Sequence, residues 1–210
     1  ENMSGTSLMP ILESAKEGLV DPSREFTDTG RERHTDARRD NLGYPVRAIH
    51  TTRYTYIHNI APDRWPGGDQ FHDCDPSPTK DLLLENRDSE EIQPFYEQAF
   101  GKRPEEELFD RKKDPYCVTN VADNPAYQEV KENLCRKLEN LLKEQGDPRT
   151  LGFGDIFDAY PRVTNTRPFL GGFHEKGAYN QTYLQKAREA MARLGYSEQD
   201  IKAMCDKPAD

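Results

Sequence analysis

The sequence is poor in apolar residues and contains no long apolar run. Hydrophobic residues make up 34% of its 210 residues, and charged residues make up 32%. No stretch approaches the roughly 18 apolar residues that a membrane-spanning helix needs, and no charged-then-apolar leader opens the chain. These features predict a chain without a membrane span, in which much of the structure is solvated or part of the core lies in another polypeptide.

The chain also lacks an excess of basic residues. Its 29 Lys and Arg residues stand against 38 Asp and Glu residues, which gives a formal net charge of -9 at pH 7. A nucleic-acid backbone selects a basic face, so this balance argues against a nucleic-acid partner. Only local clusters of basic residues are therefore candidates for binding anions.

Cysteine is scarce, and its spacing excludes two kinds of site. The four cysteines show no C-x-x-C pair, so they form neither a zinc motif nor a small disulfide framework. We expect reduced or buried thiols, and one disulfide stays open for an exported protein. The cysteines are Cys74, Cys117, Cys135 and Cys205.

Hydrophobic periodicity predicts a small antiparallel sheet covered by a long helix. Residues 45–51 and 54–59 alternate between two faces as a hairpin requires, and a shorter strand is expected at 107–110. Apolar residues recur at helical spacing over 124–145, up to a stop at Gly146. The expected fold class is therefore α+β.

The remaining segments are read from their composition and end signals. A short helix is expected at 7–12, a strand at 25–29, and two further helices at about 180–194 and 197–205. Residues 61–80 are rich in proline and contain two adjacent glycines, which predicts a long loop.

A series of motifs in fixed order resembles the carboxyl-terminal part of sulfatases. The series begins with a basic loop before the hairpin and is similar to bacterial relatives of heparan N-sulfatase (N-sulfoglucosamine sulfohydrolase). The resemblance covers residues 1–165 and implies a small antiparallel sheet with a long packed helix, the C-terminal subdomain of an alkaline-phosphatase-like enzyme. The motifs are residues 30–59, Pro62-Asp63-Arg64-Trp65-Pro66, Pro78-Thr79-Lys80, Glu107-Leu108-Phe109-Asp110, Lys113-Asp114-Pro115 and Gly146-Asp147-Pro148.

The resemblance implies three parts. Residues 1–40 would be the tail end of the sulfatase catalytic domain, residues 41–150 the C-terminal subdomain, and residues 151–210 a helical C-terminal extension. The strand at 25–29 would then join the large sheet of the amino-terminal domain and leave an unpaired edge here.

The implied function is the C-terminal portion of a sulfatase that hydrolyses sulfuric esters or sulfamates of sulfated sugars, such as glycosaminoglycans. Such a portion completes the substrate pocket and scaffold. The family's formylglycine and calcium ligands lie in the amino-terminal catalytic half, so that half is the implied partner, and calcium and formylglycine are expected only in the full enzyme. This chain is expected to be inactive in isolation. The resemblance also suggests a periplasmic or secreted location.

One segment imitates the formylglycine signature Cys-x-Pro-Ser-Arg. Cys74-Asp75-Pro76-Ser77 matches its first four places, but Pro78 stands where the arginine is needed. Prolines and glycines also predict a loop here, whereas the signature opens a helix against the central sheet. Cys74 is therefore not expected to become a catalytic aldehyde.

Four residues of the basic loop are the candidate substrate-binding residues, and none is expected to be catalytic or to bind metal. Arginine offers sulfate a planar, bidentate donor, and the acidic residue could orient an arginine or accept a sugar hydroxyl. The alternative is a set of surface ion pairs with Asp36 and Asp40. The candidates are Arg31, Glu32, Arg33 and His34.

Three further features leave alternatives open. His72, Asp73 and Asp75 could hold a divalent ion or form a solvated loop. Trp65 could stack on a sugar ring or pin its loop to the sheet. The rival to the sulfatase hypothesis is a non-catalytic glycan-binding or oligomerisation module, and a homo-oligomer is possible under either. The histidines without ligand spacing, expected to be structural or at the surface, are His50, His58, His72 and His174.

Overall fold

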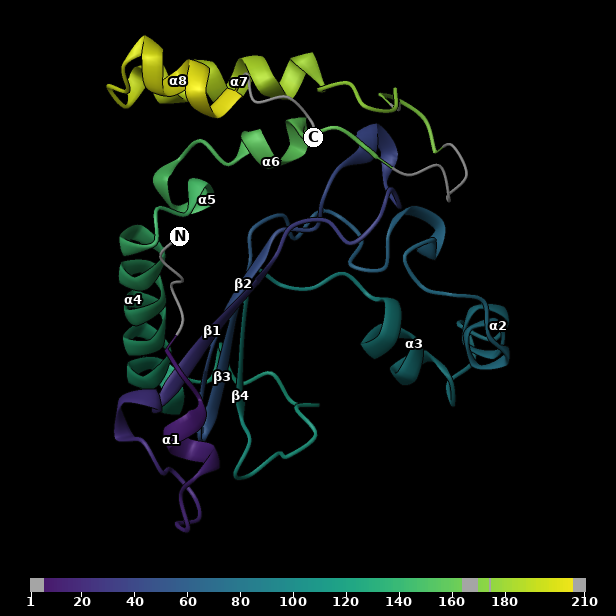
Figure 1. Ribbon diagram of the computed structural model, residues 1–210. Helices are drawn as coiled ribbons and strands as arrows, with labels where there is room; N and C mark the ends of the chain where they lie inside the picture. The colour runs from purple at the N-terminus through teal and green to yellow at the C-terminus, as the bar shows by residue number, and fades with distance from the viewer. Residues whose placement is uncertain (1–5, 164–169, 174, 206–210) are drawn as a thin grey trace.

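A four-stranded antiparallel sheet is the centre of the fold (Figure 1). The computed structural model describes residues 6–163, 170–173 and 175–205. The strands follow one another in the order β1-β2-β3-β4, and helices lie against one face and beyond one end of the sheet. This arrangement is the expected α+β class. The strands are β1 (Phe26–Arg31), β2 (Val46–Thr51), β3 (Tyr54–Asn59) and β4 (Glu106–Asp110).

The central hairpin confirms the prediction from alternation. Ala48 of β2 lies opposite Ile57 of β3, and the two strands are joined through a two-residue turn. The turn contains neither glycine nor asparagine. Instead the hydroxyl of Thr51 accepts hydrogen bonds from the backbone N–H groups of Arg53 at 3.3 Å and Tyr54 at 2.9 Å.

Helix α4 (Gln128–Glu144) covers one face of the sheet, as predicted. It follows a 3-10 turn, η4 (Pro125–Tyr127), which begins where the Asn124 side chain accepts a hydrogen bond from the N–H of Ala126. The helix ends at Gly146, whose φ is +74°. There the N–H of Gly146 reaches the carbonyl of Lys143 and the next N–H reaches Leu142, the pattern of a Schellman cap.

Two apolar clusters form the core. The first lies between the sheet and α4 and contains Ile49, Tyr56, Leu108, Ala122, Leu134, Leu138 and Leu142. The strand members Ile49, Tyr56 and Leu108 lie opposite one another on three neighbouring strands, so they share one face of the sheet and meet the leucines of α4 there. Each large side chain fully buried here stabilises the fold by about 1.5–3 kcal/mol.

The second cluster lies beyond the end of the sheet, where α7 packs against α6 and α8 packs against α7 (Figure 1). The side chains of Asn180 and Ser197 bind backbone N–H groups at the starts of α7 and α8, confirming both predicted helices. The helices are α5 (Pro148–Leu151), α6 (Asp155–Ala159), α7 (Gln181–Arg193) and α8 (Glu198–Cys205). Their core contains Phe153, Ile156, Ala159, Leu184, Ala187, Ala190, Met191 and Cys205.

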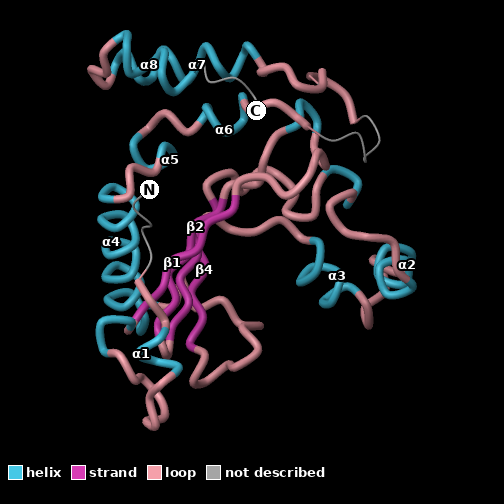
Figure 2. The backbone as a smooth tube through the Cα atoms, viewed as in Figure 1, coloured by secondary structure: helices cyan, strands magenta, loops and turns pink. Residues whose placement is uncertain are grey.

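The expected long loop is shorter than predicted. It ends at Ser77, whose hydroxyl accepts a hydrogen bond from the N–H of Lys80 and so begins α2 (Pro78–Glu85). Pro78 fits the first turn of that helix because it has no N–H to satisfy. Helix α3 (Gln93–Phe100) follows, and both helices lie apart from the sheet (Figure 2).

The amino-terminal elements differ from expectation in one respect. The short helix α1 (Met9–Leu12) forms as predicted. Strand β1, however, pairs along its whole length with β2, from Phe26 opposite Thr51 to Arg31 opposite Val46. It is therefore an edge strand of this small sheet, because its 14-residue connection to β2, residues 32–45, lets it fold back beside that strand. The domain boundaries at 40 and 150 stay predictions.

None of the helices in the described ranges is both long enough and apolar enough to cross a membrane. No disulfide joins the four cysteines, each of which lies among the described residues.

Candidate functional site

Three loops meet at the end of the sheet where β1 leads into the basic loop. The N–H of Asp69 donates to the carbonyl of Ala37 at 2.7 Å, and the N–H of Asp40 donates to the carbonyl of Gly171 at 3.0 Å. Segments far apart in the sequence are thus joined through their backbones. We call these loops, residues 32–45, 60–77 and the described parts of 160–178, the loop platform.

The platform contains two pairs of left-handed residues that are not glycine. Asp40 and Asn41 have φ values of 56° and 58°, and Gln70 and Phe71 have values of 53° and 59°. Each such residue costs about 1–2 kcal/mol, so the surrounding contacts must hold it. A hydrogen bond joins the residues that precede the two pairs: the carboxylate of Asp69 accepts from the N–H of Arg39 at 2.7 Å.

His34 is an exposed candidate of the basic loop. Its side chain is 67% exposed, and its Nδ1 lies 2.8 Å from Oδ1 of Asp73, whose side chain is only 5% exposed. Because Nδ1 faces the carboxylate, Nε2 is the ring nitrogen left for a ligand. The sequence placed Asp73 with a possible ion site, and the structure places it under His34.

Arg38 lies below this pair and is almost wholly buried. Its Nε donates to the carbonyl of Trp65 at 3.0 Å and its Nη2 to that of Pro66 at 2.7 Å, while Nη2 is 3.7 Å from Oδ2 of Asp73. Nη1 has no hydrogen-bond partner among the described residues. Burial lowers the pKa of Arg38, and the negative charge of Asp73 opposes that shift.

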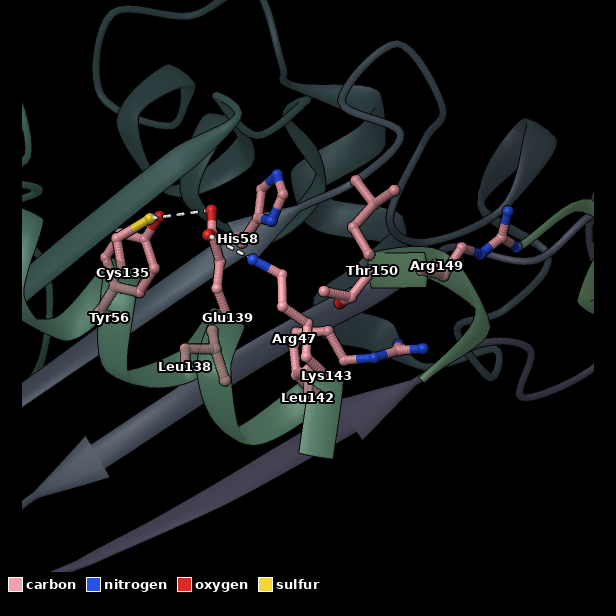
Figure 3. A pocket seen from close by; sticks show the side chains of 11 residues that line it. Arg47, Tyr56, His58, Cys135, Leu138, Glu139, Leu142, Lys143, Arg149 and Thr150 are labelled. Atoms are coloured by element: carbon pink, nitrogen blue, oxygen red, sulfur yellow. Dashed lines mark hydrogen bonds and ion pairs between the residues drawn. The ribbon is translucent and has the colours of Figure 1, made fainter. Parts of the chain in front are cut away.

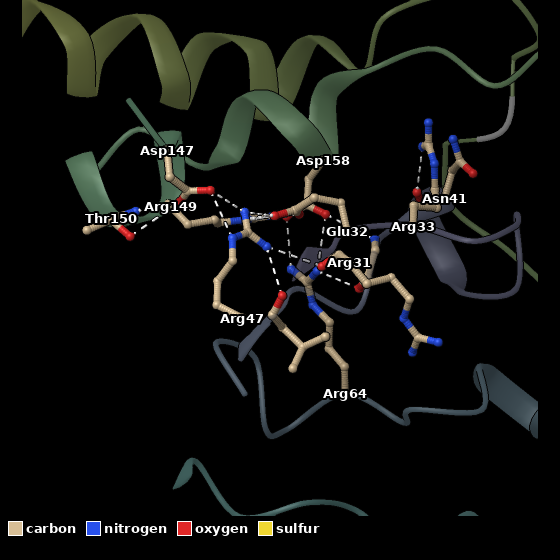
Figure 4. A network of polar contacts seen from close by, with 12 residues as sticks. Arg31, Glu32, Arg33, Asn41, Arg47, Arg64, Asp147, Arg149, Thr150 and Asp158 are labelled. Atoms are coloured by element: carbon tan, nitrogen blue, oxygen red, sulfur yellow. Dashed lines mark hydrogen bonds and ion pairs between the residues drawn. The ribbon is translucent and has the colours of Figure 1, made fainter. Parts of the chain in front are cut away.

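Arg31 is exposed beside Arg38. Its guanidinium carbon lies 5.9 Å from the ring centroid of Tyr44, and that of Arg38 lies 5.6 Å from the same centroid. Its only hydrogen bond given by the described residues is a long one of 3.5 Å to the carbonyl of Pro66. Figure 4 shows its side chain pointing away from the neighbouring ion pairs, so its donors can reach a ligand.

Glu32 and Arg33 point into the protein. Arg33 donates to the carbonyl oxygens of Asn41, Tyr160 and Pro161 at 3.0, 3.2 and 3.2 Å, and burial lowers its pKa. The alternative of surface ion pairs with Asp36 and Asp40 does not describe these two residues, since Asp36 pairs with Arg162 at 2.8 Å. The two inward residues hold the loop in place, and the two outward ones, Arg31 and His34, remain reachable.

Glu32 belongs to a buried network of ion pairs that fastens the platform to α5 and α6 (Figure 4). Arg149 Nη2 lies 2.8 Å from Glu32 and 3.1 Å from Asp158, and Arg64 Nη1 also lies 3.1 Å from Asp158. Arg47 Nη2 lies 2.7 Å from Glu32 and 2.6 Å from Asp147. We call these six residues, Glu32, Arg47, Arg64, Asp147, Arg149 and Asp158, the ion-pair seam.

Asp158 is the most buried member of the seam, with a side chain only 1% exposed. Burial alone would raise its pKa, but the guanidinium groups of Arg149 and Arg64 and the N–H of Gly43 outweigh burial and hold the pKa below its usual value. Asp158 is therefore a charged anchor of the platform.

A cavity of about 310 Å³ lies between β3, α4 and α5 (Figure 3). Its polar groups already have partners: Lys143 lies 3.5 Å from Glu139, and the Cys135 thiol lies 3.8 Å from the same carboxylate. Burial raises the pKa of that thiol, which makes it a poor nucleophile. Its two arginines, Arg47 and Arg149, belong to the seam. The cavity therefore offers no converging set of unused polar groups.

The loop with the imitation of the formylglycine signature has structural partners. Cys74 is half-buried, and its carbonyl accepts a hydrogen bond from the ammonium of Lys80 at 2.7 Å. Across the described ranges, no group of three His, Cys, Asp or Glu side chains could hold a metal ion. The residues present therefore do not fit the calcium and formylglycine that the resemblance implies for the full enzyme, and we assign no chemical step to them here.

The other aromatic and histidine candidates are used in packing. Trp65 packs edge-on against Phe71 of its own loop with ring centroids 5.6 Å apart, and the ammonium of Lys102 lies 5.3 Å from its ring centroid. His50 lies between the hydroxyls of Thr29 at 3.0 Å and Thr55 at 3.2 Å, and burial lowers its pKa. His58 lies at a long 3.8 Å from Glu105, His72 lies 3.4 Å from Gln70, and His174 lies outside the described residues.

Comparison with known proteins gives matches to parts of the chain. No model of a protein family matches it. Two proteins of Formosa agariphila, each named an ulvan-active sulfatase, are similar to it. One is 30% identical over 126 residues, which is 59% of this chain and 21% of that protein. The other is 41% identical over 49 residues, which is 23% of this chain and 10% of that protein.

The chain thus spans a fifth of the length of one of these relatives, and a tenth of the other. Neither relative is named a heparan N-sulfatase, so that narrower resemblance is not shown. The similarity nevertheless makes part of this chain a relative of sulfatases.

Proposed function

We propose that this chain is the substrate-contacting portion of a sulfatase that removes sulfate from a sulfated sugar polymer. The observation that carries the proposal is the exposed imidazole of His34, held on buried Asp73 beside the exposed guanidinium of Arg31, in a chain related to ulvan-active sulfatases. The proposed role of the platform is to bind and orient substrate, through the exposed side chains of Arg31 and His34.

The outward and inward side chains of the basic loop have different roles. Arg31 offers a planar fork to a sulfate group, and Nε2 of His34 contacts the sugar. Arg33 and Glu32 support these contacts from inside, through backbone carbonyls and through the ion-pair seam. Substrate binding therefore depends on all four residues, but only two of them touch the sugar.

The reacting groups would come from the missing amino-terminal catalytic half. Calcium and formylglycine held there would supply charge neutralisation and the nucleophile. A sulfated sugar outside the cell is the substrate class, consistent with a periplasmic or secreted location. We propose an ulvan-like sugar because the relatives are named for ulvan. The narrower heparan N-sulfatase assignment would require turnover of an N-sulfated glucosamine.

The test uses the longer protein that contains this chain, with ulvan as substrate. His34→Ala and Arg31→Ala each remove a contact worth about 1.5–3 kcal/mol, so kcat/KM should fall roughly tenfold to over a hundredfold. Arg87→Ala is the matched control, because Arg87 is an exposed cation whose one ion pair within the described part of the chain is with its neighbour Asp88. If both platform variants kept wild-type kcat/KM with unchanged thermal stability, the proposal would be withdrawn.

Measurements on the isolated chain test the rival hypothesis of a non-catalytic glycan-binding or oligomerisation module. Tight binding of ulvan by the isolated chain, with no turnover in any longer form, would favour that module. Sedimentation of the isolated chain at several concentrations would show whether it forms a homo-oligomer.

A further inference from the structure

We propose that Asp73 is a positioning residue that fixes the imidazole of His34 so that Nε2 accepts a hydrogen bond from a hydroxyl of the sugar. This inference rests on the proposed function, because it states which partner donates and which accepts the hydrogen bond in the proposed contact between His34 and the sugar. It adds a residue from the second loop of the platform to a site otherwise formed by the basic loop.

The geometry requires a defined orientation of the ring. Nδ1 of His34 lies 2.8 Å from Oδ1 of Asp73, within the range of a strong charge-assisted hydrogen bond. An ionised carboxylate can only accept hydrogen bonds, so the proton of the neutral ring must sit on Nδ1. Nε2 then carries the lone pair and acts as an acceptor.

The carboxylate of Asp73 is buried and held in place, although the imidazole that it contacts is exposed. The Asp73 side chain is 5% exposed and the Arg38 side chain is 3% exposed, and their charged groups are 3.7 Å apart. Arg38 is itself fixed by the carbonyls of Trp65 and Pro66. Because the supporting groups are buried and the imidazole is exposed, ligand binding needs no rearrangement beneath it.

The chemical class of the bound group follows from this arrangement. Arg31 carries only donors, which suit the sulfate oxygens, whereas His34 in its neutral form offers an acceptor to a hydroxyl. The two exposed residues therefore recognise two different groups of one sulfated sugar. A ligand with sulfate but no neighbouring hydroxyl would use Arg31 alone.

The first experiment is nitrogen-15 NMR of this chain with labelled histidine at about pH 8, above the ordinary histidine pKa of about 6.5. We expect the His34 ring to show a protonated Nδ1 and an unprotonated Nε2. Asp73→Asn should shift the proton toward Nε2, and Asp73→Glu should restore part of the wild-type pattern. Asp63→Asn, which removes an exposed carboxylate from the same loop, is the control. Unchanged His34 ring shifts in Asp73→Asn would overturn the proposal.

The second experiment is a double-mutant cycle in the longer protein with ulvan as substrate. Asp73→Asn should lower kcat/KM by about 5- to 30-fold when His34 is present and should have no further effect in the His34→Ala background. Far-UV circular dichroism identifies a variant that fails to fold, and Asp73→Glu then replaces it in the cycle.

The two proposals fail in different ways. An equal loss from Asp73→Asn in both backgrounds would mean that Asp73 only supports the fold, and the positioning role would be rejected while the proposed function stands. Wild-type kcat/KM in both His34→Ala and Arg31→Ala would reject the proposed function itself, whatever the NMR result.

Discussion

The sheet core and the loop platform are both buried, but they are held together by different forces. The core joins Ile49 and Leu108, each 0% exposed, to a leucine stripe on α4. The platform instead buries the charged groups of Arg38 and Asp73 beneath His34, and the ion-pair seam buries Asp158 where the platform meets α6. An apolar core tolerates another apolar group of similar volume, whereas a buried ion pair loses its balance when either partner is removed. The binding surface therefore depends on individual partners to a degree that the sheet does not.

Removing a seam carboxylate is the strongest test of that difference. Asp158→Asn removes the carboxylate paired with Arg64 and leaves Arg149 with Glu32 alone, so it should lower the free energy of unfolding by about 3–5 kcal/mol. Urea titration followed by circular dichroism measures the loss. Asp63→Asn, at an exposed position, should stay within about 0.5 kcal/mol of wild type. Equal stability of the two variants would mean that the seam does not fasten the platform.

The sheet core should respond to lost volume and not to a change of apolar side chain. Leu108→Ala should cost about 3 kcal/mol, because it opens a cavity against α4. Leu108→Met keeps the volume and should cost less than about 1.5 kcal/mol. Thermal melts of the two variants provide the comparison. A loss from Leu108→Met as large as that from Leu108→Ala would contradict this account of the core.

Substitutions at two glycines can distinguish the cost of backbone strain from the cost of a steric clash. Both Gly68, at φ +80°, and Gly146, at φ +74°, are left-handed, but only an added Cβ at Gly68 would meet Ala37, at 2.7 Å. Gly146→Ala should therefore cost about 1 kcal/mol, and Gly68→Ala about 2 kcal/mol or more. Denaturant midpoints compare the pair. If Gly68→Ala were the milder change, the loop at 60–77 would not pack against Ala37 of the loop at 32–45 as described.

The smallest effect is expected at the far end of the sheet, under acid. Arg53 bonds both oxygens of Asp110, at 3.0 and 2.7 Å, and lowers the pKa of that carboxyl to about 2. Because the folded-state pKa lies below the unfolded value of about 3.9, this stabilisation is present above about pH 4 and is lost as the pH falls toward 2. Arg53→Gln should therefore melt below wild type at about pH 6, and the gap should narrow toward pH 2. A constant gap would assign the effect to packing.

Much of the sheet region could be predicted from the sequence because its signals are local. The β2–β3 hairpin and α4 follow from alternation, helical spacing and the stop at Gly146. Helix α2 was missed because the prolines of its loop outweighed the start signal of Ser77 and Pro78. The pairing of β1 with β2 was not predicted because strand pairing is not encoded in the strand itself.

The position of the platform could be predicted from the sequence, but its long-range contacts could not. A cluster of arginines and a histidine marks the basic loop, yet nothing local shows that Arg33 binds the carbonyl of Tyr160, 127 positions away. Arg64 and Asp158 are 94 positions apart, and Arg149 and Glu32 are 117 apart. Such pairs have no periodicity, so only the folded chain shows which charges meet. The support of His34 by Asp73 was hidden for the same reason, across 39 positions.

The edge-on packing of Trp65 against Phe71 gives the protein a built-in optical probe. Trp65 is the sole tryptophan of the chain, and it sits in the platform, whereas the sheet core contains tyrosines. Selective excitation of tryptophan therefore reports on the platform, while far-UV circular dichroism follows the helices and strands as a whole. When the two signals are recorded on one sample, loosening of the binding surface can be timed separately from loss of the fold.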